Sequence, residues 1–252
     1  MICLMSNSEI IINPCRDKGD PKIPSTGLLL INPAEADAGL RLAKNKGGSQ
    51  HFLFNSRLML IPENESSGSF FIAGPAVGAP MAVLTLEKLI AMGTRRIITF
   101  GWCGSLSSIM KIGDVLLPTW AISNEGTSAH YPVSSRPESH TPTHNTLSEG
   151  LTAQRFTIHS GPIWTTDAPY RESFSQVKQL GEEGILGVDM EYAALIAAAT
   201  FRKVELTTVL LVSDELWHGK WKPGFRTKEF KKKSRDILHF LADFCSDLSS
   251  AK

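Results

Sequence analysis

Residues 187–214 carry the pattern that decides the fold, GVDMEYAALIAAATFRKVELTTVLLVSD. The short apolar run at 187–190 passes into an alanine-rich stretch at 191–200, which predicts a helix. The apolar run at 206–212 stops at Ser213 and Asp214, which predicts a buried strand. Strands that alternate with helices indicate an α/β domain.

The same alternation continues over the rest of the chain. Apolar runs predict further strands at 28–31, 52–61, 69–73, 96–100, 115–120 and 156–164, with 63–68 as the turn between the second and third. Helical spacing predicts helices at 40–46, 79–92, 172–180 and 227–248. The segment 132–150, rich in Ser, Thr, Pro and His, is expected to be a long surface loop.

The length of the chain and the lack of a repeat or linker in its sequence indicate one domain. A chain of 252 residues can bury a large core, and no repeat or linker divides it. The polar residues 1–25 contain three prolines and are expected to form an N-terminal extension. We therefore expect one α/β domain over residues 26–252.

Charge and composition disfavour several classes of partner. The 26 basic and 25 acidic residues give a net charge of +1, which argues against nucleic acid or an anionic membrane as the partner. No run reaches about 20 apolar residues, and the N-terminus lacks the pattern of a signal peptide. The four cysteines and the histidines have no metal-binding spacing, so we expect free thiols, no metal site and a cytoplasmic protein.

Three strand ends carry small or acidic residues, and open α/β sheets bind their ligands at strand ends. The glycines of 101–105 suit a tight turn and a close approach to a ligand equally well. The acids of 189–191 and 213–215 either cap a helix or turn, or bind a substrate. A carboxylate such as Glu191 suits two neighbouring sugar hydroxyls, and a partly desolvated Asp214 can donate a proton near neutral pH.

Taken together, these segments resemble the nucleoside phosphorylase superfamily. The similarity is carried by GWCGSL at 101–106, KIGDV at 111–115, GVDMEYAA at 187–194 and VSDE at 212–215. The stretches EGTSAHY at 125–131 and TTDAPY at 165–170 are most similar to the uridine and purine phosphorylase branch. The resemblance spans roughly residues 28–248 and implies a single-domain, three-layer α/β/α fold with a mixed central sheet.

The resemblance also implies an activity and a site. It implies cleavage of the N-glycosidic bond of a purine or pyrimidine nucleoside by a homo-oligomer that needs no cofactor. Asp214 would protonate the leaving base, Glu191 would bind the ribose hydroxyls, and Met190 would pack against the sugar. The remaining members of the expected substrate site are Asp189, Tyr170 (close to the base), Trp102, Gly101 and Ser213.

The expected phosphate-binding positions depart from the family pattern. The family's Gly-Asp-Pro segment and the arginine after it are replaced here by NPAEAD at 32–37. Thr99 stands where a second arginine is usual, and Trp102 replaces a small hydroxyl residue. The tryptophan either fills the phosphate space, stacks on a base, or simply packs in the core.

The residues of the acceptor site therefore leave two interpretations. Basic residues elsewhere could rebuild an anion site, although they could equally be solvated surface charges: Arg57, Lys220, Lys222 and Arg226. Alternatively, Glu35 or Asp37 could orient a water molecule, or cap the adjacent helix.

Three functions follow from these alternatives. Phosphorolysis, with phosphate as co-substrate, is the prediction from overall motif similarity. Hydrolysis is the alternative that the acids suggest, and an inactive nucleoside-binding protein is the alternative that the missing arginines suggest. In each case the aromatic stretch 217–225 is expected to act as a lid over the site.

Overall fold

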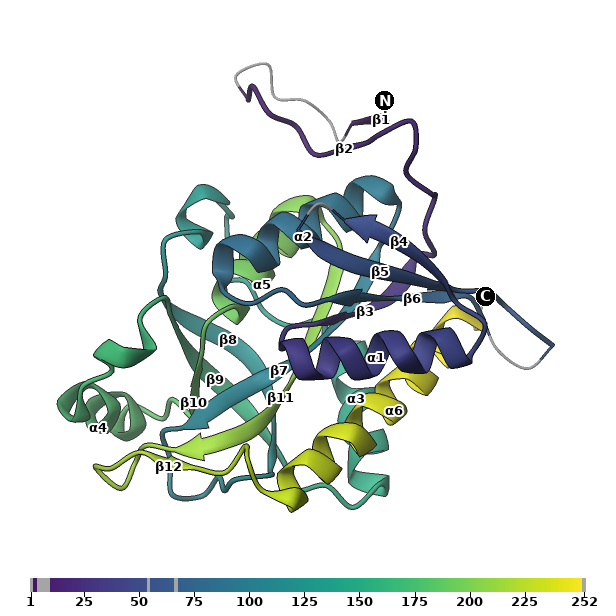
Figure 1. Ribbon diagram of the computed structural model, residues 1–252. Helices are drawn as coiled ribbons and strands as arrows, with labels where there is room; N and C mark the ends of the chain where they lie inside the picture. The colour runs from purple at the N-terminus through teal and green to yellow at the C-terminus, as the bar shows by residue number, and fades with distance from the viewer. Residues whose placement is uncertain (1, 4–9, 54, 66–67, 251–252) are drawn as a thin grey trace.

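The computed structural model describes residues 2–3, 10–53, 55–65 and 68–250. Ten strands form one large mixed sheet in the order β12-β11-β8-β9-β10-β7-β3-β6-β5-β4. These are β3 (Thr26–Leu30), β4 (Ser49–Leu53), β5 (Ser56–Ile61), β6 (Phe70–Gly74), β7 (Arg96–Ser105), β8 (Val115–Asn124), β9 (Ile158–Thr166), β10 (Gly187–Asp189), β11 (Glu205–Glu215) and β12 (Lys222–Pro223). A separate pair, β1 (Ile2–Cys3) and β2 (Cys15–Arg16), lies apart from this sheet (Figure 1).

Helices cover both faces of the large sheet (Figure 1). They are α1 (Pro33–Asn45), α2 (Ala79–Met92), α3 (Thr141–Ala153), α4 (Phe174–Glu182), α5 (Tyr192–Arg202) and α6 (Lys228–Ser250), with short 3-10 turns η1 (Ser128–His130) and η2 (Pro169–Arg171). Helices α2 and α5 pack together on one face, and α1 packs with α6 on the other. The expected α/β fold with a mixed central sheet is confirmed.

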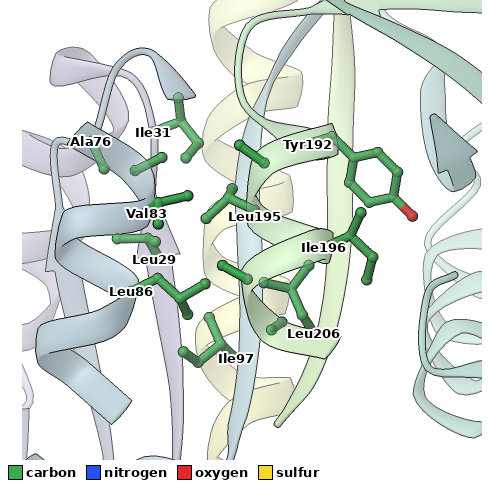
Figure 2. Close-up of a cluster of buried hydrophobic side chains, with 14 of the residues drawn as sticks. Leu29, Ile31, Ala76, Val83, Leu86, Ile97, Tyr192, Leu195, Ile196 and Leu206 are labelled. Carbon is green, nitrogen blue, oxygen red and sulfur yellow. The ribbon is translucent and has the colours of Figure 1, made fainter. Parts of the chain in front are cut away.

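Successive side chains of β3 point to opposite faces of the sheet, so this strand contributes to the core on both sides. Leu28 and Leu30 point into the core beneath α1 and α6. Leu29 points the other way and lies in one cluster with Val83 of α2 and Leu195 of α5 (Figure 2). All three leucines are fully buried, because a central strand with helices on both sides has no solvent-facing position.

Part of the sheet closes on itself, and this closure assembles the site. Strand β7 pairs with β10 and with β11, while β11, β8, β9 and β10 pair in succession, so five strands form a ring. Gly104, near the end of β7, is in register with Val188 of β10 and with Asp214 of β11. The motifs at 101–106, 187–194 and 212–215 therefore meet at one point.

Several local predictions need correction. The segment 132–150 is not a long loop, because α3 occupies its second half, and Leu147 and Leu151 lie one helical turn apart and fully buried. The polar composition concealed this apolar stripe. The strand predicted at 52–61 is a hairpin of β4 and β5, and the helix predicted at 40–46 begins earlier, at Pro33, a residue favoured in a first helical turn.

The cysteines also differ from expectation. Cys15 is disulfide-bonded, whereas Cys103 and Cys245 are free and buried. The expectation of free thiols is therefore wrong for Cys15 and is confirmed for Cys103 and Cys245. Within the described residues, no helix is long and apolar enough to cross a membrane.

Candidate functional site

A cavity of about 580 Å³ opens where β7, β10 and β11 end, and we call it the main cavity. Seven predicted site residues line it: Trp102, Tyr170, Asp189, Met190, Glu191, Ser213 and Asp214. Gly101 is not among its lining residues. A side chain there would meet Ile31 and Leu210, so Gly101 serves close packing inside the sheet, and Gly104 takes its place at the cavity wall.

Asp189 holds the start of α5 in place. Its Oδ1 accepts a hydrogen bond from Thr165 Oγ1 at 2.6 Å. Its Oδ2 accepts from the backbone N–H groups of Glu191 at 3.2 Å and Tyr192 at 2.7 Å. These bonds satisfy amides at the N-terminus of the helix, so this buried acid acts as a helix cap as well as a wall of the cavity.

Glu191 is held by the backbone at the start of α2. The backbone N–H of Gly78 donates to Glu191 Oε1 at 2.6 Å, and Gly78 adopts a positive φ of 84° that favours glycine. Burial, and then the negative charge of Asp189, raises the pKa of Glu191. The result is a positioned carboxyl group with acceptor capacity left for a ligand.

Asp214 lies at a bulge near the end of β11. The hydroxyl of Ser213 donates to its Oδ1 at 2.5 Å, and the indole N–H of Trp221 donates to its Oδ2 at 2.9 Å. Both oxygens therefore accept a hydrogen bond before any ligand arrives. Trp221 belongs to the aromatic stretch 217–225, which returns to β11 through β12.

Two further residues that line the main cavity, Glu172 and Asn32, are not among the predicted site residues. Glu172 lines it, and burial, followed by the charge of Asp214, raises the pKa of Glu172 to about 7. Asn32 also lines it, and its buried Oδ1 has no hydrogen-bond partner among the described residues. Glu172 follows the TTDAPY segment by only two residues, but proximity along the chain does not reveal which side chain faces a cavity.

Tyr170 lies at the mouth of the main cavity rather than deep inside it. It lines the cavity and yet is fully exposed to solvent, at 101%. In the described chain its ring is therefore free to meet a ligand at the entrance. Val188, Asp189 and Glu191 line the same cavity but are buried, and we call this part of the lining the inner wall.

The predicted acceptor residues are scattered. Thr99 is fully buried in β7, where its hydroxyl is 2.6 Å from that of Thr208. Arg57 forms an ion pair with Asp37, and neither residue lines the main cavity. Arg226 is exposed and lies against the ring of Phe225, with its guanidinium carbon 5.8 Å from the ring centroid.

Glu35 lies in a second, smaller cavity of about 360 Å³, between α1 and α6. Ser234 donates to its Oε1 at 2.6 Å, and burial raises the pKa of Glu35. Trp102 and Phe225 line both cavities and stack on each other with ring centroids 5.8 Å apart. Trp102 thus separates Glu35 from the main cavity.

The two cavities differ in charge. Among the described residues, the acids that line the main cavity are Glu172, Asp189, Glu191 and Asp214, and no Lys or Arg lines it. The smaller cavity is lined by Arg41, Lys231 and Arg235 beside Glu35. A phosphate dianion in the main cavity would therefore meet carboxyl groups without a Lys or Arg from the described residues.

Comparison with known proteins gives the family. The model of the phosphorylase superfamily matches residues 52–247. A guanosine phosphorylase from Halorubrum lacusprofundi is 26% identical over 211 residues, which are 82% of this chain and 87% of that protein. A DeoD-type purine nucleoside phosphorylase from Bacillus thuringiensis is 29% identical over 151 residues, 59% of this chain and 64% of that protein.

Solved structures agree with the fold. The purine nucleoside phosphorylase from Toxoplasma gondii in complex with immucillin-H superposes with a TM-score of 0.79 at 16% identity, covering 92% of this chain and 94% of that one. The uridine phosphorylase from Vibrio fischeri gives a TM-score of 0.72 at 18% identity, with coverages of 89% and 90%. Since the family model spans well over half of the chain, the protein is an enzyme of the phosphorylase superfamily.

Proposed function

We propose that the protein cleaves the N-glycosidic bond of a purine nucleoside bound in the main cavity. The observation that carries the proposal is the placement of Glu191 and Asp214 in one cavity, each already oriented by a hydrogen bond from its surroundings. The cavity volume, about 580 Å³, suits a small molecule of this size.

The sugar is assigned to the inner wall. A carboxylate accepts hydrogen bonds from two neighbouring hydroxyls, and Gly78 uses only part of the acceptor capacity of Glu191. Met190 supplies an apolar contact beside it. As the bond to the base breaks, positive charge develops on the sugar, and the acids that surround it stabilise that charge.

The base is assigned to the side of Asp214 and Glu172. A purine offers a ring nitrogen that accepts a proton, and acids at this end of the cavity suit it. The relatives with the names guanosine phosphorylase and purine nucleoside phosphorylase support a purine over a pyrimidine.

Water is the acceptor that the geometry favours. The main cavity has no Lys or Arg in its described lining, and Trp102 and Glu35 replace residues that the family uses for phosphate. Glu35 lies behind Trp102 and is not placed to act on that water directly.

Phosphate is the second candidate acceptor. The cations of the smaller cavity, Arg41, Lys231 and Arg235, support it, as do the names of the relatives. Phosphate would then enter beside Trp102, and replacing Arg41 and Arg235 by glutamine would abolish the phosphate dependence of base release. The homo-oligomer implied by the family resemblance belongs to the same proposal, and light scattering of the purified chain tests it.

Release of the base tests the proposed cleavage. Adenosine, guanosine, inosine and uridine are incubated with the full chain, and free base is quantified by chromatography. We expect turnover of at least one purine nucleoside and its loss in Glu191→Ala. The exposed Glu183→Gln is the control, since Glu183 lies on the surface after α4 and outside both cavities. Tight binding of nucleosides without release of any base would favour a binding protein instead.

A further inference from the structure

The smaller cavity combines an aromatic interior with a basic rim. It measures about 360 Å³ and lies between α1 and α6, which pack side by side on one face of the sheet (Figure 1). We propose that this cavity is a second ligand-binding site, which takes a flat aromatic ring that carries an anionic group, either a carboxylate or a phosphate. The inference goes beyond the proposed function, because no step of the cleavage uses this ligand.

The interior of the smaller cavity suits a flat ring. Trp102, Phe225 and Phe230 line it, together with Leu238 of α6. Trp102 stacks on Phe225 and meets Phe230 edge-on, with ring centroids 5.1 Å apart in the second pair. These contacts hold the three rings in place before a ligand arrives, and aromatic surfaces of this kind pack well against another ring. The volume falls within the range of roughly 300–1,000 Å³ that is usual for small-molecule sites.

Three cations from two helices line the same cavity. They are Arg41 of α1 and Lys231 and Arg235 of α6. All three are exposed, so they lie toward the opening rather than at the inner end. Within the described part of the chain, neither an ion pair nor a hydrogen bond engages the charged group of any of them. Their donors are therefore available to an anion.

The stability of α6 does not explain its two cavity cations. Lys231 is the fourth residue of the helix, where the positive end of the helix dipole disfavours a cation. Lys231 and Arg235 are also four residues apart, so two like charges are neighbours on one side of the helix. The adjacent Lys232 instead pairs with Asp236 at 2.8 Å. An anionic ligand in the cavity supplies the opposite charge that Lys231 and Arg235 lack.

Glu35 is the one acid among the described residues that line the smaller cavity, and it does not neutralise the rim. It is 6% exposed, and its Oε1 accepts a hydrogen bond from Ser234 at 2.6 Å. Burial raises the pKa of Glu35, which favours its neutral form. The inner end of the cavity is thus polar at one point, and the rim keeps its positive charge.

These features define both parts of the ligand. An inorganic anion would meet the cations but leave the aromatic walls without a contact. A neutral ring would pack against Trp102 and Phe225 but leave the three cations unpaired. The main cavity has no Lys or Arg in its described lining and four acids, so it disfavours an anion. Charge therefore separates the ligands of the two cavities.

Binding of four probes to the full chain tests the inference. Isothermal titration calorimetry is performed with 1-naphthoate, adenosine 5′-monophosphate, the neutral 1-naphthalenemethanol and inorganic phosphate. We expect at least one of the two aromatic anions to bind about tenfold or more tightly than both the alcohol and inorganic phosphate, because ring and charge each add a contact. The naphthoate and nucleotide arms show whether the anionic group is a carboxylate or a phosphate.

Paired variants locate the binding. Arg41→Gln combined with Arg235→Gln should weaken binding of that anion by about tenfold or more, the effect of losing roughly one hydrogen bond between charged groups. Lys44→Gln combined with Lys228→Gln is the matched control, since both lysines are exposed, belong to the same two helices and line neither cavity. Ala38→Phe leaves the cations in place but fills part of the smaller cavity, and it should weaken binding as well. A probe held in the main cavity would respond to none of these changes.

Four results would overturn the inference. They are the absence of detectable binding of either aromatic anion, equal binding of the neutral alcohol or of inorganic phosphate, and an equal loss in the control pair. The fourth is base release that depends on phosphate in the wild type and loses this dependence in the Arg41→Gln and Arg235→Gln pair, since the cavity would then hold the acceptor. A chain that binds the aromatic anion but cleaves no nucleoside would contradict the proposed function alone.

Discussion

Trp221 and Asp214 are joined by a hydrogen bond of 2.9 Å from the indole N–H to Oδ2, although Trp221 is 63% exposed. The bond ties the aromatic stretch 217–225 to the end of β11, and β12 adds a second link through the pairing of Pro223 with Asp214. Because Trp221 and Phe225 both line the main cavity, this stretch forms one of its walls.

The first prediction concerns this link. Trp221→Phe keeps an aromatic ring but removes the donor, so Asp214 loses one of its two fixed hydrogen bonds. We expect KM for the nucleoside to rise about tenfold, the cost of roughly one hydrogen bond to a charged group. Steady-state kinetics measure it, with Trp120→Phe as the control because Trp120 does not line the main cavity. An unchanged KM would show that the link does not hold the site.

A second prediction concerns Glu191 and the ribose hydroxyls. Glu191→Gln keeps one oxygen that can accept from Gly78, but it replaces the other oxygen by an amide NH2, which cannot accept a hydrogen bond from a ribose hydroxyl. We expect kcat/KM for the ribonucleoside to fall by about 100-fold. The 2′-deoxyribonucleoside should lose much less, since it offers one hydroxyl fewer, and equal losses for both sugars would contradict the assignment.

The same variant should be more stable than the wild type at alkaline pH. The pKa of Glu191 is raised in the folded protein, so the unfolded chain loses this proton at a lower pH and wild-type stability declines as pH rises between the two values. Glutamine has no proton to lose. We therefore expect the difference in Tm between Glu191→Gln and wild type to grow from pH 5 to pH 8 in a thermal scan. A difference that is constant or shrinks would refute this.

A fourth prediction tests the cap at Asp189. Asp189→Ala leaves two buried backbone N–H groups, of Glu191 and Tyr192, without their acceptor. We expect a loss of about 2–3 kcal/mol in the free energy of unfolding, measured by urea denaturation. Asp189→Asn retains an acceptor oxygen and should lose less. If alanine costs no more than asparagine, the cap does not stabilise α5.

The sequence could indicate candidate site residues where an acidic side chain directly follows an apolar run. Glu191 and Asp214 follow such runs, and parallel pairing of β7 with β11 brings two of the motifs to one edge of the sheet. Helix α2 has the predicted bounds because glycine and proline mark its start and Gly93 its end.

Other features depend on contacts between distant segments. Asn32 reaches the cavity because β3 pairs with β7, and Glu172 because the sheet closes between β7 and β11. No local spacing indicates either pairing. Thr99 occupies a position that the family uses for phosphate, but its side chain turns into the sheet to meet Thr208. The sequence left two roles open for Asp189, a helix cap or a ligand contact. The structure shows the cap, because Asp189 accepts hydrogen bonds from the first backbone N–H groups of α5.

The sugar product formed in the presence of phosphate is the most direct test of the account. A purine nucleoside that the full chain cleaves is incubated with and without inorganic phosphate, and the product is separated by anion-exchange chromatography. We expect free base and free ribose at the same rate in both conditions, since no Lys or Arg among the described residues lines the main cavity. Ribose 1-phosphate formed at a rate that depends on phosphate would contradict it, and would assign the acceptor to the cavity behind Trp102.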